Sequence, residues 1–415
     1  MASSASVVSA VPAAADERPF LARLPLLLVG IGGGLALLGL LIPGLQKQFA
    51  FSWLLAFMFY LSLMLGGLFL VILHHLFDAQ WSVPIRRINE HLACSAPLLA
   101  VLFLPILGNA LFAGPEKAIF QWMHTDSAGD HALAAKKALF NRPTWVVVSV
   151  GLFVVWHFLT NGLRKASLAQ DRSGAASHTR RMRVLAAAGI FIFAITLTLG
   201  AILWMKSLQW QWFSTMYGVY YFAGSVWLTV GTVYVLTLYL RKTGPLGRVA
   251  QPVIFHDIGK LFFAFTVFYA YIAFSQYFLI WNANVPEETF WYVLREKGSW
   301  WSIGMLMIFG HFFLPFLLLL RIDTKMSFTV MLPLAVWAWL MHFCDLSFNI
   351  MPVLHPNGFV LHWLDLACMA FMGGAMAWWF IRNFNAHPPF PQRDPRMSEC
   401  LGLYLPPAKP HGGAH

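Results

Sequence analysis

Long apolar runs, almost free of charge, alternate with short polar segments along the whole chain. Ten of these runs are long enough for a membrane helix, which needs about 20 residues to cross a bilayer. Tryptophan and tyrosine crowd the ends of the runs, as they do at membrane–water interfaces. We predict an all-α integral membrane protein with about ten spans, over residues 24–45, 52–76, 91–112, 143–163, 182–204, 214–240, 256–282, 301–320, 328–350 and 357–381.

Two of the predicted spans resemble each other. Spans 143–163 and 301–320 both follow a long loop, and each has Ser-x-Gly near its start and one histidine further along. Internal repeats of this kind are typical of membrane proteins built from two similar units. The pattern predicts two four-helix bundles, formed by spans 2–5 and 6–9, with spans 1 and 10 at the flanks. Chance similarity between apolar helices explains the resemblance equally well.

The composition excludes a soluble or a disordered protein. Hydrophobic residues make up 59% of the 415 residues and charged residues 11%, whereas a soluble domain averages about 25% charged residues. The formal net charge of +11 comes from Lys and Arg that cluster in the tails and in alternate loops. This distribution orients the chain in the membrane and does not indicate binding to nucleic acid. We predict a multi-pass protein of the bacterial inner membrane with both termini in the cytoplasm.

The predicted parts are a cytoplasmic tail over 1–23, a polytopic membrane domain over 24–381 and a second cytoplasmic tail over 382–415. Two loops on the outer side, 113–142 and 283–300, are long, but neither is long enough to form a cofactor-binding domain. In the first of them, Asp130 precedes an apolar run and predicts a short helix with an N-cap. We therefore expect any electron carrier to belong to another chain.

The sequence lacks the motifs that hold redox centres. Its four cysteines form no CxxC pair and no CxxCH motif, so we expect no iron–sulfur cluster, no c-type haem and no metal bound by this chain. His74 and His75 are adjacent and point about 100° apart on a helix. No predicted span carries two histidines separated by two turns, as a stacked pair of b-type haems requires. A b-type haem cytochrome stays an alternative interpretation, because six histidines lie in or near the spans.

The strongest candidate site lies in the last two spans. His342 and Asp345, like His362 and Asp365, form a His-x-x-Asp pair, and this spacing places both side chains on one helix face. Because the connection 351–356 is short, we expect the two pairs to share one polar cluster in the outer half of the membrane. Ionisable side chains at this depth are costly and indicate a proton route or a quinol pocket. Hydrogen bonds between helices are the alternative interpretation.

Further candidates lie in other spans. His311 falls near the middle of its span, where it is a candidate for a proton pathway. His256, Asp257 and Lys260 lie at the inner end of one span and predict either a proton entry port or an interfacial salt bridge with an outward-reaching lysine. The candidates for contact with a quinone are Tyr220, Tyr221, Gln276 and His157. For the tyrosines, core packing with hydrogen-bonded hydroxyl groups is the alternative.

One part of the chain resembles a known family. The stretches HDIGKLFFAFTVFYAYIAFSQYFLIWNANVPEETFWY (256–292) and STMYGVYYFAG (214–224) are similar to the ActF subunits of alternative complex III. These subunits belong to the NrfD/PsrC-like superfamily of quinone-interacting membrane proteins. The similarity is clearest from about residue 200 to residue 365, and SQYFLIWNANVPEET is its most specific part.

The resemblance implies a membrane subunit of a quinol:cytochrome c oxidoreductase. Its relatives take menaquinol or ubiquinol as substrate and pass electrons to a periplasmic acceptor. They assemble with a paralogous NrfD-like subunit, an iron–sulfur subunit, and multihaem and monohaem cytochrome c subunits, while the membrane subunit itself carries no metal. The family implies proton movement through polar residues, for which His311, Asp345 and Asp365 are the candidates here. A transporter-like or structural subunit without a redox role is the remaining alternative.

Overall fold

The computed structural model describes residues 19–126, 129–247 and 249–401. These residues form ten helices that are long and apolar enough to cross a membrane, and they contain no strand. The prediction of an all-α membrane protein with ten spans is therefore confirmed. Most of the predicted tail 1–23, and residues 402–415 of the other tail, lie outside the described residues.

Eight of the spans are single helices: α1 (Pro19–Leu41), α2 (Gln46–Phe77), α7 (Arg142–Ser173), α8 (Ala176–Trp204), α9 (Tyr217–Lys242), α10 (Pro252–Ala283), α15 (Phe328–Ile350) and α16 (Trp363–Asn385). The third span is broken into α3 (Val83–Ala93), α4 (Ala96–Leu102) and α5 (Leu104–Phe112). The eighth consists of α12 (Ser299–Leu306), the π-helical turn η5 (Met307–Phe313) and α13 (Leu314–Leu320).

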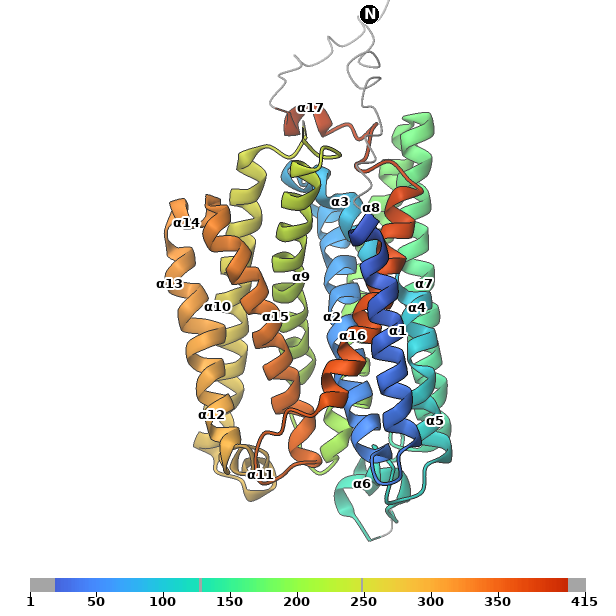
Figure 1. Ribbon diagram of the computed structural model, residues 1–415, viewed down its shortest axis with the longest axis vertical. Helices are drawn as coiled ribbons and strands as arrows, with labels where there is room; N and C mark the ends of the chain where they lie inside the picture. The colour runs from blue at the N-terminus through green and yellow to red at the C-terminus, as the bar shows by residue number, and fades with distance from the viewer. Residues whose placement is uncertain (1–18, 127–128, 248, 402–415) are drawn as a thin grey trace, which may run out of the picture.

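Short elements mark the two ends of the helix bundle. We call one end the terminal side, because the described chain begins there with α1 and ends there with α17 (Met397–Cys400) (Figure 1). The short helix α14 (Ile322–Met326) also lies at this end. The opposite end, which we call the loop side, carries α6 (His131–Ala135) and α11 (Pro286–Arg295). The predicted cap of the first loop helix is confirmed, because the Asp130 carboxylate accepts a hydrogen bond from Leu133 N at 3.0 Å.

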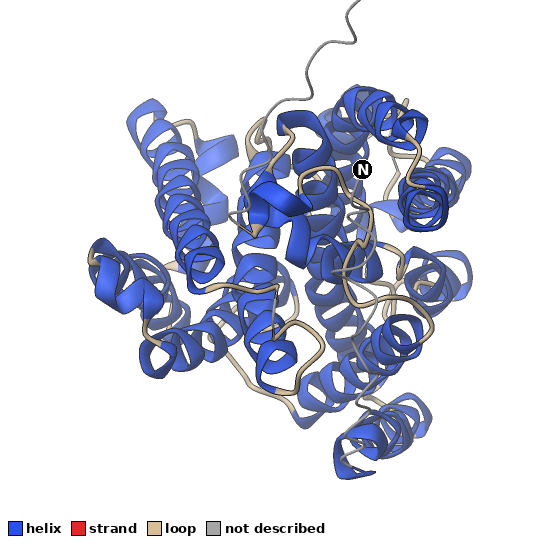
Figure 2. Cartoon of the chain, turned by 90° about the horizontal axis from the view of Figure 1, so that it is seen from above, coloured by secondary structure: helices blue, strands red, loops and turns tan. Residues whose placement is uncertain are grey.

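The ten spans pack as two groups of four with two flanking helices, as predicted (Figure 2). The first group contains α2, α3–α5, α7 and α8, and the second contains α9, α10, α12–α13 and α15. Helix α2 packs against α9 where the groups meet, and it is buried on almost all sides. Its sequence is apolar all round, which is typical of a helix with no lipid-facing side. Helix α1 packs on α16, and α16 packs on α2.

The third span begins earlier than predicted. Its helical residues start at Gln80 and not at 91, so Arg86, Arg87 and Glu90 lie inside the bundle and are at most 2% exposed. The prediction failed because these charges argued against a membrane segment. In the structure they pair with one another and with distant residues, which offsets the cost of burying them.

The tenth span begins later than predicted, at Trp363 and not at 357. His362 is the N-cap of α16, and its ring accepts a hydrogen bond from Leu364 N at 3.2 Å. Asp365 completes a capping box by accepting from His362 N at 2.9 Å. The polar pair therefore starts the helix, and both residues lie at its loop-side end.

The π-helical turn η5 has a local cause. Pro315 has no backbone N–H and cannot continue the regular ladder to the carbonyl group of His311. The wider turn leaves the Gly310 carbonyl free to accept a hydrogen bond from Trp337 Nε1 of α15 at 2.8 Å. Turns of this kind occur often at functional sites, and this one holds the buried side chain of His311.

Candidate functional site

A buried carboxylate lies at the centre of the second four-helix group. Asp345 of α15 is 2% exposed. Its Oδ1 accepts a short hydrogen bond from the Tyr220 hydroxyl of α9 and a second one from Asn349 Nδ2, one turn along α15, at 3.2 Å. Among the described residues no lysine or arginine forms an ion pair with Asp345. The carboxylate is thus held by neutral donors.

Two more tyrosines extend this arrangement. The hydroxyl oxygens of Tyr220 and Tyr269, which comes from α10, lie 2.7 Å apart. On the loop side of the carboxylate, the Tyr217 hydroxyl donates to Asn349 Oδ1 at 3.1 Å. A continuous row of hydrogen-bonding groups therefore runs from Tyr217 through Asn349, Asp345 and Tyr220 to Tyr269.

His311 lies next to Tyr269, at the end of the row opposite Tyr217. Its ring is fully buried between the rings of Tyr269 and Trp227, with centroid distances of 3.8 Å to each. Neither ring nitrogen has a hydrogen-bond partner among the described residues. Stacking on both faces fixes the plane of the imidazole, while its nitrogens stay available as proton donor or acceptor.

His342 lies beside the carboxylate, one turn before Asp345 on the same face of α15. Its Nδ1 lies 4.0 Å from Asp345 Oδ2, and its Nε2 lies 3.0 Å from the Ser62 hydroxyl oxygen of α2. A Cβ atom at Gly224 of α9 would lie 3.2 Å from the imidazole and 3.6 Å from Asp345 Oδ2. An added Cβ atom would require the imidazole of His342 to move by a few tenths of an ångström. The predicted pairing of His342 with Asp345 on one helix face is therefore present in the structure.

Arg295 of α11 closes the loop-side end of the site. Its guanidinium donates to the carbonyl groups of Phe348 and Asn349 at 2.8 and 3.0 Å, and it stacks 3.3 Å above the Trp291 ring. Burial lowers the pKa of Arg295 to about 9. These bonds satisfy the last free carbonyl groups of α15, which a helix end requires. The loop helix α11 is thereby fixed to the helix that carries Asp345.

Asp365 does not belong to this cluster, so the predicted single site is wrong. Its Oδ1 accepts from the Ser52 hydroxyl at 2.5 Å, whereas His342 contacts Ser62. The two serines are ten residues apart on α2, or about 15 Å along the helix axis. The prediction failed because the tenth span begins at His362, which leaves Asp365 in the first turn of α16, beside the start of α2.

The other candidates are dispersed. Asp257 and Lys260 form an ion pair at 2.6 Å on the terminal side, with the lysine side chain 56% exposed, and His256 lies half-buried beside them. Tyr221 donates to the Met58 carbonyl of α2 at 2.7 Å.

The remaining two quinone candidates lie on opposite groups of helices. Gln276 of α10 accepts from Ser214 at 2.7 Å and donates to Tyr292 at 3.1 Å near the loop side. His157 of α7 contacts Asn161 of the same helix at 2.8 Å. Of the four quinone candidates, only Tyr220 lies against Asp345.

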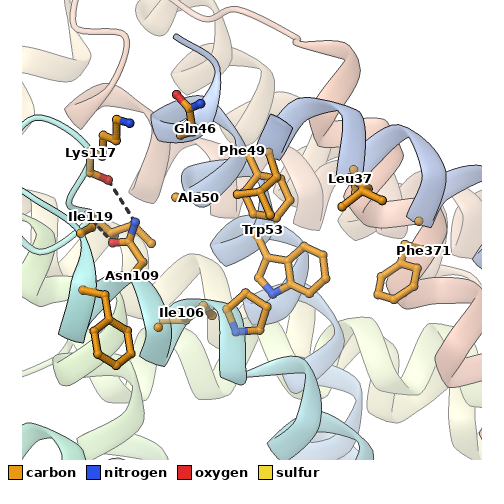
Figure 3. A pocket seen from close by; sticks show the side chains of 17 residues that line it. Leu37, Gln46, Phe49, Ala50, Trp53, Ile106, Asn109, Lys117, Ile119 and Phe371 are labelled. Atoms are coloured by element: carbon orange, nitrogen blue, oxygen red, sulfur yellow. Dashed lines mark hydrogen bonds between the residues drawn. The ribbon is translucent and has the colours of Figure 1, made fainter. Parts of the chain in front are cut away.

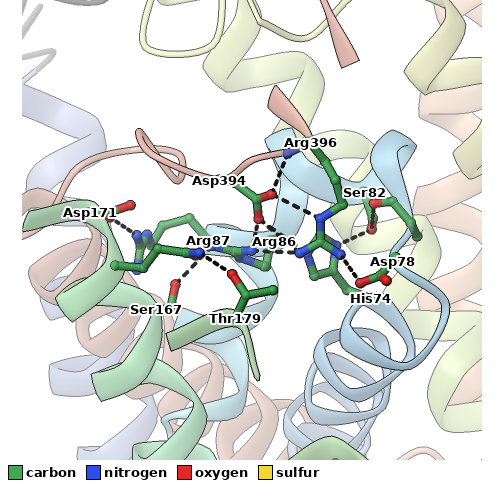
Figure 4. Close-up of polar contacts among 12 residues, drawn as sticks. His74, Asp78, Ser82, Arg86, Arg87, Ser167, Asp171, Thr179, Asp394 and Arg396 are labelled. Carbon is green, nitrogen blue, oxygen red and sulfur yellow. Dashed lines mark hydrogen bonds and ion pairs between the residues drawn. The ribbon is translucent and has the colours of Figure 1, made fainter. Parts of the chain in front are cut away.

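A second polar network, which the sequence did not predict, lies on the terminal side (Figure 4). Arg86 of α3 is its centre. The guanidinium forms ion pairs with Glu90 at 3.2 Å and with Asp394 from the segment after α16, and it donates to the Ser167 hydroxyl at 3.2 Å. Its Nη1 also lies 3.0 Å from His74 Nε2.

The network continues to both sides of Arg86. Arg87 pairs with Glu90 at 2.7 Å and with Asp171 of α7, which also accepts from Gln392 N at 2.9 Å. Although burial opposes ionisation, hydrogen bonding to His74 and the nearby charge of Arg86 hold the pKa of Asp394 below its usual range. Residues 392–396 are thus bound to α2, α3 and α7. The signal in the sequence was the run Arg86-Arg87-x-x-Glu90, whose spacing favours intrahelical pairs.

The cluster around Asp345 is suited to proton transfer. The cluster contains a carboxyl group, two tyrosine hydroxyl groups in contact, and an imidazole whose nitrogens have no hydrogen-bond partner among the described residues. Each of these groups can donate or accept a proton without movement of the backbone. Within the described residues, no three His, Cys, Asp or Glu side chains converge in a way that could hold a metal ion. Comparison of the chain with models of known protein families, and with curated protein sequences, gives no match.

Proposed function

We propose that this chain is the membrane subunit of a quinol-oxidising electron-transfer complex of the alternative complex III type, and that the cluster around Asp345 moves protons for it. In this proposal the chain lies in a bacterial inner membrane with the terminal side in the cytoplasm and the loop side in the periplasm. Partner subunits with iron–sulfur clusters and c-type haems carry the electrons. Quinol oxidation releases two protons for every two electrons, and this chain provides a route for them.

The observation that carries the proposal is the burial of Asp345 without a lysine or arginine partner in the described part of the chain. Ionisable side chains inside a membrane are costly, and they are kept mainly where they bind or transport ions. A purely structural link between α9 and α15 needs only neutral hydrogen-bonding groups. The carboxylate instead joins a row of hydrogen-bonding groups that begins near the loop side and ends at Tyr269, whose ring stacks on His311.

The resemblance of residues 256–292 to the ActF family supports the redox part of the proposal. Tyr269 of the cluster and Gln276 both lie in this stretch. Because three of the four quinone candidates lie away from Asp345, we assign proton transfer to this chain. The quinol site then belongs to the paralogous membrane subunit or to its interface with this chain.

Two experiments test the proposal separately. Purification of the tagged full chain from a mild detergent should bring down iron–sulfur and multihaem c-type subunits, identified by mass spectrometry and by visible haem absorbance. Isolation of the chain alone, or with transport proteins only, contradicts the redox assignment. In the purified complex, Asp345→Asn should lower quinol turnover or proton release roughly tenfold or more, with all subunits retained. Unchanged turnover and coupling contradict the role of Asp345.

A further inference from the structure

A cavity of about 560 Å³ lies in the loop-side half of the bundle, between α1, α2, α5 and α16 (Figure 3). Its walls are apolar and come from helices far apart in the sequence. They include Leu37 of α1, Phe49 and Trp53 of α2, Ile106 of α5 and Phe371 of α16. The cavity is separate from the cluster around Asp345, none of whose residues lines it.

The cavity is open towards the lipid. Among its lining residues, Leu37 is 54% exposed, Leu40 is 45% exposed and Phe112 at the end of α5 is 86% exposed. These residues lie in membrane spans, where the surrounding medium is hydrocarbon. An apolar hollow at this depth is unfavourable for water, and an empty one loses dispersion contacts along its walls. A hydrocarbon chain is the occupant that satisfies both conditions.

The hydrogen-bond donors that are free among the described lining residues lie at the rim of the cavity. Trp53 Nε1 in the wall already donates to the Leu102 carbonyl at 2.8 Å. Asn109 donates to the Lys117 carbonyl at 3.0 Å and accepts from Ile119 N at 2.9 Å, which fixes the loop above α5. The Lys117 ammonium is exposed and forms no ion pair within the described residues. The Gln46 side chain uses its oxygen to accept from Gly44 N at 3.0 Å, which leaves its NH₂ group as a donor.

We propose that this cavity binds a phospholipid of the leaflet on the loop side. One acyl chain fills the apolar cavity, and the phosphate accepts hydrogen bonds from Lys117 and Gln46 at its rim. The positive charge favours a phosphate over the neutral head group of a quinone, because only the anionic phosphate adds the attraction between opposite charges. The lipid would join α1 to α2 and α5. The proposal does not depend on the proposed redox function.

Photo-crosslinking tests the proposal directly. The probe is a phosphatidylglycerol with a diazirine in one acyl chain, incorporated into nanodiscs that contain the full chain in its native assembly. After irradiation, mass spectrometry should locate the label on peptides of α1, α2 and α5 that line the cavity. Labelling spread evenly over all lipid-exposed helices contradicts the proposal. Selective labelling of these peptides by a photoactivatable quinone, but not by the phospholipid, contradicts it equally.

Matched variants make the test specific. A Cβ atom at Gly108 meets nothing within 4 Å, so Gly108→Leu places its side chain in the cavity without a backbone clash. Gly34→Leu is the control, because Gly34 of α1 also has open space around it but does not line the cavity. Lys117→Ala removes the charge at the rim, and Lys137→Ala removes an exposed lysine elsewhere in the same loop.

We expect Gly108→Leu and Lys117→Ala each to lower cavity labelling roughly fivefold or more, and both control variants to leave it unchanged. Size-exclusion chromatography verifies that each variant assembles. If Gly108→Leu fails to assemble, the surface variant Lys117→Ala still decides the question. Unchanged labelling in Lys117→Ala rules out recognition of the head group.

Discussion

Tyr220 of α9 and Tyr269 of α10 place their hydroxyl oxygens 2.7 Å apart, and Tyr220 at the same time donates to the carboxylate of Asp345. Three helices of one four-helix group therefore meet through polar side chains inside the membrane. Because Tyr269 also stacks on His311, the two tyrosines together connect Asp345 with His311.

Tyr220→Phe tests whether this link carries protons. The substitution keeps the ring but removes the hydroxyl group between Asp345 and Tyr269, so we expect proton release by the complex to slow roughly tenfold. The loss of a buried hydrogen bond to a carboxylate should also destabilise the fold by about 1.5–3 kcal/mol. Proton release is measured with a pH indicator in proteoliposomes.

Tyr221→Phe is the matched control for this experiment. Its hydroxyl group donates to the Met58 carbonyl at 2.7 Å and lies outside the row that contains Asp345. We expect a similar loss of stability with normal proton release. Equal effects of both substitutions on proton release would show that the tyrosines serve packing alone.

Gly66→Ala tests the packing of α2 against α9. A Cβ atom at Gly66 would lie 2.8 Å from the backbone carbonyl oxygen of Ser225, which cannot move without shifting α9. Overpacking of this kind costs about 1–3 kcal/mol, so the midpoint of thermal unfolding should fall. At Gly34 a Cβ atom meets nothing within 4 Å, and Gly34→Ala should leave the midpoint unchanged. A stable Gly66→Ala protein would contradict the close approach of these helices.

Asp394→Asn tests the network on the terminal side. It leaves Arg86 buried with less compensating charge, and breaking a buried ion pair in this way costs about 3–5 kcal/mol. Because the pKa of Asp394 is lowered in the folded protein, its contribution to stability is complete above the usual carboxyl pKa of about 3.9 and is lost as the pH falls below it. The effect of the substitution should thus be constant between about pH 5 and pH 8.

Asp323→Asn is the control for Asp394→Asn. Asp323 pairs with Arg321 at 2.5 Å on the same side of the bundle, but both side chains are more than half exposed. Exposed pairs contribute about 0–1 kcal/mol, so its removal should change the unfolding midpoint little. A comparable loss of stability in both variants would contradict the claim that burial makes the Asp394 ion pair more important for stability than an exposed pair.

Lys206 gives a pH-dependent prediction for the alkaline range. Burial and the nearby charge of Lys136 lower the pKa of Lys206 to about 8, whereas an unfolded lysine titrates at about 10.4. Between these values the unfolded chain binds more protons, so stability should increase as the pH rises from about 8 to about 10. Lys206→Met should reduce this increase in the thermal midpoint, and Arg295, whose pKa is also lowered, to about 9, should supply the part that remains. Lys137→Met should retain the full increase. A midpoint that falls over this range in the unmodified protein would contradict the burial of a charged Lys206.

The length of the apolar runs was sufficient to predict the number of spans, because each run is long enough to cross a bilayer. The start of the third span was not predictable in this way. Part of the compensation for burying Arg86 comes from Asp394, which lies 308 residues further along the chain. The start of the tenth span was missed for a related reason, since His362 and Asp365 form the capping box that begins α16 and do not lie further inside the span.

The candidate site was predictable only in part. Spacing alone placed His342 and Asp345 on one face, and membrane depth identified His311 as a candidate. The sequence could not show that Tyr220 and Tyr269 join these residues, because which face of α9 and α10 turns inward depends on packing between helices. For the same reason it could not show that Asp365 turns towards Ser52 of α2. The π-helical turn around His311 has no clear sequence signal apart from Pro315.

The most direct test of the account is the number of protons released per electron by the purified complex in sealed proteoliposomes. The unmodified complex is compared with Asp345→Asn and with Asp365→Asn, which changes a second buried carboxylate outside the cluster. We predict that Asp345→Asn lowers proton release per electron or stops turnover, while Asp365→Asn retains the normal ratio in the complex that assembles. A normal ratio and normal turnover in Asp345→Asn would contradict the proposed role of this chain in proton movement.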